Sequence, residues 1–168
     1  MIMSEKLTKK DIEKIEAEIE HRKLVLRKEL IEAVKEARAH GDLSENFEYH
    51  AAKREKNKNE SRIRYLEKML KTAIIVENQS QSGEIGLNHS VTVAFEDGEE
   101  ETYRIVTSIR GNSLANRVSI ESPLGKALLG HKAGDKVKVQ VNSENSYFLT
   151  ILAVDESDME ENEEIRKF

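Results

Sequence analysis

The sequence predicts an α+β protein, with a long N-terminal antiparallel coiled-coil hairpin of helices followed by an antiparallel β-sheet domain with one short helix. Residues 8–77 contain no proline and a single glycine, Gly41, whereas residues 78–168 hold the other seven glycines and the only proline. Alternating apolar and polar residues follow from residue 91 onward, as is typical of strands. We therefore expect a hairpin domain at 1–77, a polar linker at 78–83, a sheet domain at 84–154 and an acidic tail at 155–168.

The first predicted helix covers residues 11–40. Its apolar residues recur mainly at steps of three, four or seven, and they are Ile12, Ile15, Ile19, Leu26, Leu30, Val34 and Ala37. This spacing indicates one apolar helix face, with an imperfect heptad around Arg22 and Lys23. Thr8 followed by Asp11 resembles a capping box at the helix start. A helix of this length is a rod of about 45 Å.

The second predicted helix begins near Asp42 or Ser44. Its apolar positions are Phe47, Ala51, Ile63, Leu66 and Leu70. The stretch KREKNKNESR, residues 53–62, has no apolar residue, so the pattern predicts that the middle of the hairpin is loosely held. A short bend at Gly41 makes the two helices antiparallel neighbours.

Five segments of the second half have the composition and alternation of strands, and they are residues 91–95, 101–109, 117–121, 136–141 and 146–154. EDG (96–98) and NSEN (142–145) are predicted turns between strands. Ser122 is expected to cap a short helix that starts at Pro123 and is ended by Gly130. The sheet is therefore small and mostly antiparallel.

The composition excludes several classes of protein. The chain has no cysteine, so disulfides and thiolate metal sites are excluded. No apolar run approaches the roughly 18 residues of a membrane span, and the N-terminus lacks a signal-peptide core. We therefore expect a cytoplasmic protein that contacts no membrane. No catalytic triad, phosphate-binding loop or dinucleotide fingerprint is present.

The net charge of −5 is unevenly distributed. Residues 1–77 hold 18 Lys and Arg against 16 Asp and Glu, whereas residues 78–168 hold 9 against 16. The acidic second half is a poor general surface for nucleic acid. The tail, with its run of acids from Asp155 to Glu164, is predicted to be a solvated and partly disordered end.

Two carboxylates, Asp42 and Glu45, lie three residues apart at the predicted bend. This spacing fits a capping box at the start of the second helix, where carboxylates are also favoured by the helix dipole. Spacing alone favours this cap, and the alternative is a shared metal site, because Mg²⁺ in proteins commonly takes one or two carboxylates and completes its shell from phosphates and water. A zinc site with His40 and His50 is disfavoured, because too few ligands are present.

Basic and aromatic residues flank the two acids. Arg38, Lys53 and Arg54 lie about one turn away, where they either pair with acids at i,i+4 or contact phosphates. Phe47 shares a helix face with Ala51, so packing is the favoured interpretation for it. For Tyr49, packing and an exposed contact surface remain equally open.

The stretch IEAVKEARAHGDLSENFEYHAAK, residues 31–53, resembles the tip of the bacterial GreA/GreB transcript cleavage factors. The resemblance continues in SRIRYLEKML (61–70) and in SPLGKALLGHKAGDKVKV (122–139), and it spans most of residues 7–154. It implies an N-terminal coiled coil and a C-terminal FKBP-like domain without isomerase activity.

The resemblance also implies partners. Members of this family bind bacterial RNA polymerase, insert the coiled coil into its secondary channel and stimulate cleavage of the 3′ end of backtracked nascent RNA. The protein would need no cofactor of its own and would share Mg²⁺ with the polymerase. Its partners would be the polymerase, the RNA 3′ end and DNA within the elongation complex, and it is expected to be a monomer.

The family's functional residues can be placed on this chain. Asp42 and Glu45 correspond to the acids that hold the shared Mg²⁺, and Arg38 and Lys53 fall where the family carries basic residues near the RNA. The RNA and polymerase contacts of the same motif are completed by Ser44, Asn46 and Tyr49. The segment implied to dock on the polymerase contains Ser122, Pro123, Leu124, Gly125 and Lys126.

The chain departs from the family pattern at several places. Phe47 stands where alanine is usual, residues 108–120 lack an acidic segment, and the tail after Val154 is an extension. These departures leave the residues of the cleavage chemistry in place and bear on the subfamily and on docking. Two other functions are alternatives. One is an inhibitory regulator that enters the secondary channel without stimulating cleavage, and the other is a helical-hairpin adaptor in which the two acids serve only as caps.

Overall fold

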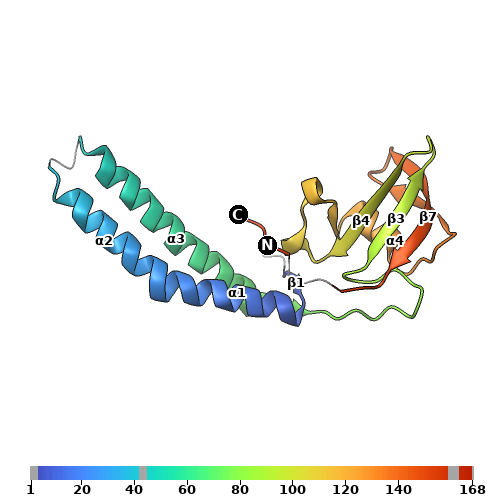
Figure 1. Cartoon of the computed structure of the whole chain (residues 1–168), viewed down its shortest axis with the longest axis horizontal. Helices are drawn as coiled ribbons and strands as arrows, with labels where there is room; N and C mark the ends of the chain where they lie inside the picture. Colours follow the sequence, from blue (N-terminus) through green and yellow to red (C-terminus); the bar gives the residue numbers. More distant parts are fainter. Residues whose placement is uncertain (1–3, 42–44, 159–162, 168) are drawn as a thin grey trace. The chain divides into compact units, whose positions relative to one another are not determined.

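The computed structural model describes residues 4–41, 45–158 and 163–167, so Asp42 and Ser44 lie outside the described residues. The chain forms two compact units (Figure 1). The first contains residues 11–73 and is helical. The second contains residues 5–10 together with the chain from residue 74 onward, and it is built around a β-sheet. The fold class is therefore α+β.

The first unit consists of α1 (Lys9–His21), a π-helical segment η1 (Arg22–Leu26), α2 (Arg27–Arg38) and α3 (Phe47–Thr72). Helix α1 begins directly after Thr8, and η1 falls where the heptad pattern of the sequence is imperfect. α2 and α3 lie side by side (Figure 1). The buried apolar residues of this unit include Ile15, Ile63, Leu66 and Met69.

The middle of the helical unit is not loosely held, and that expectation is wrong. Arg27 donates from Nε and Nη2 to both carboxylate oxygens of Glu60, at 3.0 and 2.9 Å. Arg62 donates from Nε to Glu18 at 2.8 Å and from Nη2 at 3.3 Å. Paired guanidinium and carboxylate groups of this kind are strong and geometrically specific. Ion pairs thus hold the helices together where the sequence has no apolar residues.

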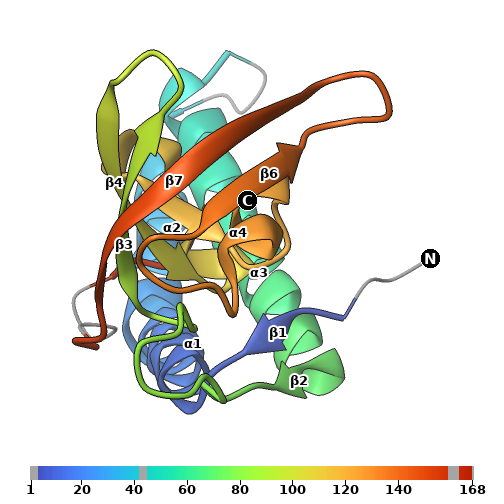
Figure 2. The same ribbon diagram turned by 90° about the vertical axis from the view of Figure 1, so that its right-hand side faces the viewer.

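The second unit contains a five-stranded sheet in the order β5-β4-β3-β7-β6 (Figures 1 and 2). Its strands are β3 (Ser90–Phe95), β4 (Glu100–Val106), β5 (Arg117–Ser119), β6 (Lys136–Gln140) and β7 (Ser146–Asp155). Neighbouring strands are antiparallel except β4 and β5, which are parallel. A separate parallel pair joins β1 (Lys6–Leu7) to β2 (Ile74–Ile75), which the sequence pattern did not predict.

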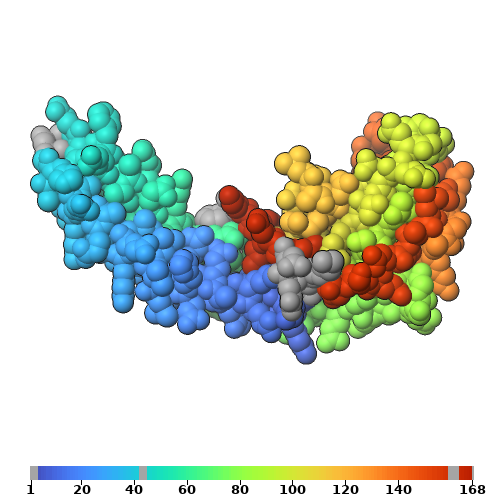
Figure 3. All heavy atoms as spheres, in the orientation of Figure 1, coloured from blue at the N-terminus to red at the C-terminus, as the bar shows by residue number. Residues whose placement is uncertain are grey.

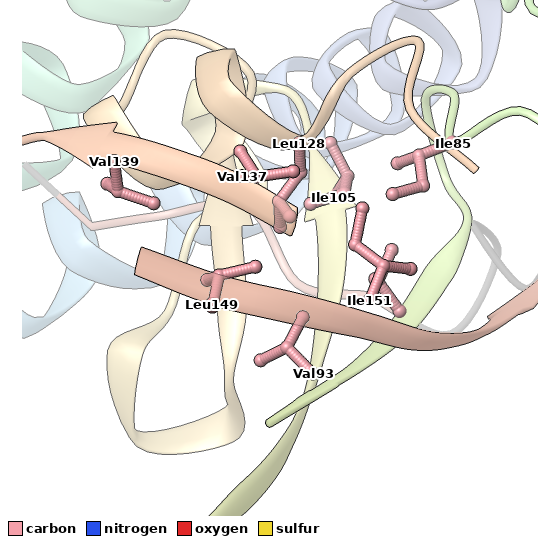
Figure 4. Close-up of a cluster of buried hydrophobic side chains, with 9 residues drawn as sticks. Ile85, Val93, Ile105, Leu128, Val137, Val139, Leu149 and Ile151 are labelled. Atoms are coloured by element: carbon pink, nitrogen blue, oxygen red, sulfur yellow. The ribbon is translucent and has the colours of Figure 1, made fainter. Parts of the chain in front are cut away.

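The core of this unit lies between the sheet and the short helix α4 (Pro123–Leu128) (Figure 4). Alternate residues of β3, β6 and β7 face it, as the period of a strand requires. Leu128 joins them from α4. The buried cluster comprises Ile85, Val91, Val93, Ile105, Leu128, Val137, Val139, Leu149 and Ile151.

The predicted strand at 101–109 is too long. β4 ends at Val106, and Ser108–Arg110 form a 3₁₀ turn, η2, followed by a second one, η3 (Ser113–Ala115). The Arg110 side chain is fully buried and contacts Glu163, so a polar anchor rather than the alternation of a strand sets this local structure.

The tail is not solvated throughout, contrary to its composition. Glu163 is 7% exposed, and Arg166 donates its backbone N–H to the carbonyl of Ile109 at 2.6 Å. A side chain of an acidic tail is therefore packed against the sheet domain. Among the described residues, no helix is long and apolar enough to cross a membrane.

Candidate functional site

The candidate site is the end of the helical unit, where α2 stops and α3 starts. Asn46 is the N-cap of α3, because its Oδ1 accepts the backbone N–H of Tyr49 at 3.0 Å. Its Nδ2 donates to the carbonyl of Ala37 in α2 at 2.6 Å. One amide therefore satisfies groups at the ends of both helices. The expectation that α3 begins near Asp42 or Ser44 is wrong, since it begins at Phe47.

This position of the cap bears on the two tip acids. Glu45 precedes the N-cap, so it does not occupy the N3 position that a capping box requires. Its side chain is exposed, and among the described residues no hydrogen bond or ion pair engages it. An accessible carboxylate fits the hard oxygen ligand that Mg²⁺ prefers. Asp42, the other tip acid, lies outside the described residues.

Tyr49 is surrounded by cations. It is buried, and the Arg38 guanidinium lies over its ring at 5.5 Å from the centroid. The hydrogen bond from Arg38 to the phenol, followed by the positive charge of Lys53 and that of Lys56, lowers the Tyr49 pKa. The structure thus brings Arg38, Tyr49 and Lys53 together. Lys56 was missed, although its spacing from Lys53 places both on one helix face.

A histidine–carboxylate pair spans the same end. His40 Nδ1 lies 2.9 Å from Oε2 of Glu48, and both side chains are exposed. The hydrogen bond to Glu48 raises the His40 pKa. The pair links the chain just after α2 to the first turn of α3, and no short-range sequence signal indicated it.

Phe47 does not pack in the hairpin, so that expectation is wrong. It is 86% exposed at the first position of α3, and Ala51 on the same face is exposed as well. The face that Phe47 and Ala51 share is therefore turned away from α2. A large exposed aromatic side chain at the tip is available for contact with a partner.

Within the described part of the chain, the basic residues of the tip are not paired with acids of their own helix. Ion pairs one turn apart occur on both helices, as Lys35 with Glu32 and Lys58 with Glu55 show. Among the described residues, no such pair involves Arg38, Lys53 or Arg54. Lys53 and Arg54 therefore do not form the i,i+4 pairs that the sequence left open within the described residues, whereas Asp42, four residues after Arg38, lies outside them.

The segment predicted to dock, residues 122–126 of the second unit, is partly structural. Ser122 Oγ accepts the N–H of Gly125 at 3.0 Å and donates to the carbonyl of Ser119 at 2.7 Å. A Cβ on Gly125 would lie 1.9 Å from that carbonyl oxygen, so glycine is required there. Leu124 is half-buried against the core, whereas Pro123 and Lys126 are exposed and free to contact a partner.

No autonomous metal centre is formed by the described residues, which contain no group of three or more His, Asp or Glu side chains suited to hold an ion. Glu45 alone supplies too few ligands. Any metal at this end would therefore need most of its ligands from elsewhere.

Two family models match the sequence. The model described as Transcription elongation factor, N-terminal, matches residues 5–75, and the model described as Transcription elongation factor, GreA/GreB, C-term, matches residues 79–156. The chain belongs to the GreA/GreB family of transcription elongation factors. Residues 157–168 of this family member lie beyond both models.

Curated relatives support the assignment. Transcription elongation factor GreA of Geobacillus kaustophilus is 47% identical over 136 residues, which is 80% of this chain and 86% of that protein. GreA of Macrococcus caseolyticus is 42% identical over 149 residues, 88% of this chain and 94% of that protein. GreA of Bacillus subtilis is 43% identical over 135 residues, which is 80% of this chain and 86% of that protein.

Solved structures were also matched. GreA factor homolog 1 of Thermus thermophilus is 31% identical, with a TM-score of 0.41 over 90% of this chain and 99% of that one. The GreA/GreB factor of Nitrosomonas europaea is 18% identical, with a TM-score of 0.39 over 92% of this chain and 99% of that one.

Proposed function

We propose that this GreA/GreB family member binds bacterial RNA polymerase and stimulates cleavage of backtracked nascent RNA by donating tip carboxylates to the polymerase active site. The observation that carries the proposal is the exposed Glu45, which precedes the Asn46 cap instead of capping α3 itself. The protein would act without catalysing a reaction of its own, in the cytoplasm, as a monomer and with no membrane partner.

Glu45 and Asp42 would hold a Mg²⁺ ion shared with the polymerase. When bound, such an ion orients and activates water for attack on a phosphodiester. The chain's contribution is to supply carboxylate oxygens from a rod-like support. Asn46 would position Glu45, because its two hydrogen bonds fix the start of α3 against the end of α2.

The cations around Tyr49 would bind the RNA 3′ end. Arg38, Lys53 and Lys56 all act on one phenol oxygen, so their charges converge in a small space. Converging cations suit the phosphates of a displaced RNA strand. Ser44 would belong to the same contact surface, and DNA in the elongation complex is a further neighbour of the inserted tip.

The proposal extends to the two units of the fold. We propose that the helical unit is an antiparallel coiled coil, divided from an FKBP-like domain at residues 78–83. The second domain would dock on the polymerase through the exposed residues of the segment 122–126, Pro123 and Lys126, with Ser122 and Gly125 setting the local backbone and Leu124 packing beneath.

Cleavage in a reconstituted backtracked elongation complex with Mg²⁺ tests the proposal. Asp42→Asn and Glu45→Gln should each slow cleavage by at least about tenfold, a typical loss when a group that supports a metal is removed. Glu55→Gln is the matched control and should cleave like the unaltered protein, because Glu55 is an exposed glutamate of α3 that pairs with Lys58 of the same helix.

Polymerase binding must be measured in the same variants. Full cleavage by both tip variants would refute donation of the carboxylates. Slower nucleotide addition without cleavage by the unaltered protein would identify the inhibitory regulator instead. Unchanged binding together with loss of cleavage supports the proposal, because the tip acids are then needed for the reaction and not for docking.

A further inference from the structure

Three arginines of the second unit converge on one carboxylate of the tail. Arg104 comes from β4, Arg110 from η2 and Arg117 from β5, and we call these three residues the arginine site. Arg110 Nη1 lies 2.6 Å from Oε1 of Glu163, and Arg104 Nε lies 2.7 Å from its Oε2. Arg117 Nε is 3.8 Å from the same Oε2. Figure 3 shows the red atoms of the tail beside the segment 108–120.

The arginine site is buried and preorganised. The side chain of Arg110 is fully buried, and those of Arg104 and Arg117 are 14% and 17% exposed. Backbone carbonyls orient two of them: Arg117 Nε donates to the carbonyl of Arg110 at 2.9 Å, and Arg104 Nη1 donates to that of Asn88. Buried guanidinium groups held in this way are typical of a specific anion site, not of solvated surface charge.

Other described residues of the tail make further contacts. Arg166 pairs with Glu5, and Glu156 accepts the backbone N–H of Gly83 at 3.1 Å. Asp158, more than half exposed, lies 3.6 Å from Arg104. An exposed contact such as that of Asp158 contributes little. Glu163 is the described tail residue that the buried arginines hold, and it lies beyond residue 156, where the family match ends.

We propose that the arginine site is a binding site for a phosphate group, and that Glu163 occupies it as an internal ligand of the chain. The planar donor forks of arginine match carboxylate and phosphate oxygens alike. A phosphate carries more charge than a carboxylate and offers three acceptor oxygens, so it suits three converging guanidinium groups better. Buried arginines cannot be left without an anion. Glu163 and phosphate therefore exclude each other from the site, and binding of phosphate is coupled to release of the tail.

Removal of the internal ligand in the full-length chain tests the proposal. Glu163→Ala should lower the melting temperature of the sheet domain by about 5 °C or more in chloride buffer, because the arginines lose their anion. Inorganic phosphate should restore the melting temperature at matched ionic strength. Calorimetry should show one phosphate bound with a dissociation constant on the order of millimolar or below. Adenosine 5′-monophosphate in place of inorganic phosphate shows whether a monoester or the free ion binds better.

Glu164→Ala is the matched control, because Glu164 is the adjacent glutamate and is exposed. It should bind no phosphate at these concentrations and should melt like the unaltered protein. Arg117→Gln added to Glu163→Ala should abolish phosphate binding. Phosphate affinity that is equal in Glu163→Ala and Glu164→Ala, or that survives Arg117→Gln, would overturn the proposal.

A folding defect leaves the proposal testable. If Glu163→Ala does not fold in chloride, refolding is compared in phosphate and in chloride of equal ionic strength. Recovery of native circular dichroism in phosphate alone supports an anion site. Equal failure in both buffers counts against it, and Glu163→Gln, which keeps the size of the side chain, then repeats the binding measurement.

Discussion

The side chain of Asn59 in α3 makes two hydrogen bonds with Arg22, the first residue of the π-helical segment. Its Nδ2 donates to the carbonyl of Arg22 at 3.2 Å, and its Oδ1 accepts from Arg22 Nη1 at 3.0 Å. The backbone N–H of Arg27 donates to the same carbonyl, five residues back along the helix. Widened turns of this type need partners for displaced backbone groups. Asn59 thus stabilises an irregular helix turn from the opposite helix.

Replacing Asn59 by alanine should destabilise the helical unit. Asn59 is only 3% exposed, and its loss leaves polar groups of Arg22 without their partner. The free energy of unfolding should fall by about 1–3 kcal/mol, as measured by urea denaturation followed by circular dichroism. Asn57→Ala, an exposed asparagine of the same helix, should change it by less than about 0.5 kcal/mol. Equal losses in the two variants would contradict the role of the Arg22 contact.

The helical unit was predictable from sequence in its extent but not in its interior. Spacing of apolar residues gave a helix over residues 11–40, and the structure has helical residues from Lys9 to Arg38. The polar stretch 53–62 gave no signal of pairing, because ion pairs such as Arg27 with Glu60 join residues far apart in the chain. Hydrophobic periodicity detects apolar faces and cannot detect a polar seam.

The stability of the helical unit should fall in acid through Glu18. Partial burial acts to raise its pKa, but hydrogen bonds from Arg62 and then Arg22 outweigh burial and leave the pKa below its ordinary value of 4.5. The unfolded chain then takes up the proton first as the pH falls. The stabilising contribution is therefore complete above about pH 4.5 and is lost as the pH falls through the folded-state pKa.

A comparison with Glu18→Gln isolates this contribution. Unfolding free energies of the two proteins should differ most near neutral pH and should converge as the pH falls below 4.5. Urea denaturation at a series of pH values gives the difference directly. A difference that stays constant down to pH 3, or thereabouts, would show that the charge of Glu18 is not what stabilises the hairpin.

Alanine at position 125 should destabilise the sheet domain. Its Cβ would lie 1.9 Å from the carbonyl oxygen of Ser119, so the backbone of β5 or α4 must move. Overpacking of this kind costs about 1–3 kcal/mol or more, to be measured by thermal unfolding of the full chain. Gly111→Ala is the control, because the nearest atom there is 3.3 Å away and the backbone φ of −60° suits any residue. A smaller loss for Gly125→Ala than for Gly111→Ala would contradict the close approach.

The candidate site was predictable only in part. The residue types near the tip were visible in the sequence, and so was the helix in which Tyr49 lies. The residue that caps α3 could not be predicted, because Asp42, Ser44 and Asn46 are all good N-cap residues and the sequence alone does not rank them. Asn46 is selected in the structure because its amide also reaches the end of α2, a contact that requires the two helices to be already paired.

The pKa of His40 should show whether His40 and Glu48 are in contact in solution. Its pKa is raised by the hydrogen bond and charge of Glu48, so the imidazolium should persist above the ordinary value of 6.5 and should titrate at lower pH in Glu48→Gln. Nuclear magnetic resonance of the imidazole protons measures both values, with Glu55→Gln as the control that leaves the His40 pKa unchanged. Any stabilisation of the folded protein by the raised His40 pKa is complete below pH 6.5 and is lost as the pH rises through the folded-state pKa.

Because both groups are exposed, the effect on the free energy of unfolding should be small. A His40 pKa that is equal in Glu48→Gln and Glu55→Gln would mean that the chain after α2 is not held against the first turn of α3 in solution.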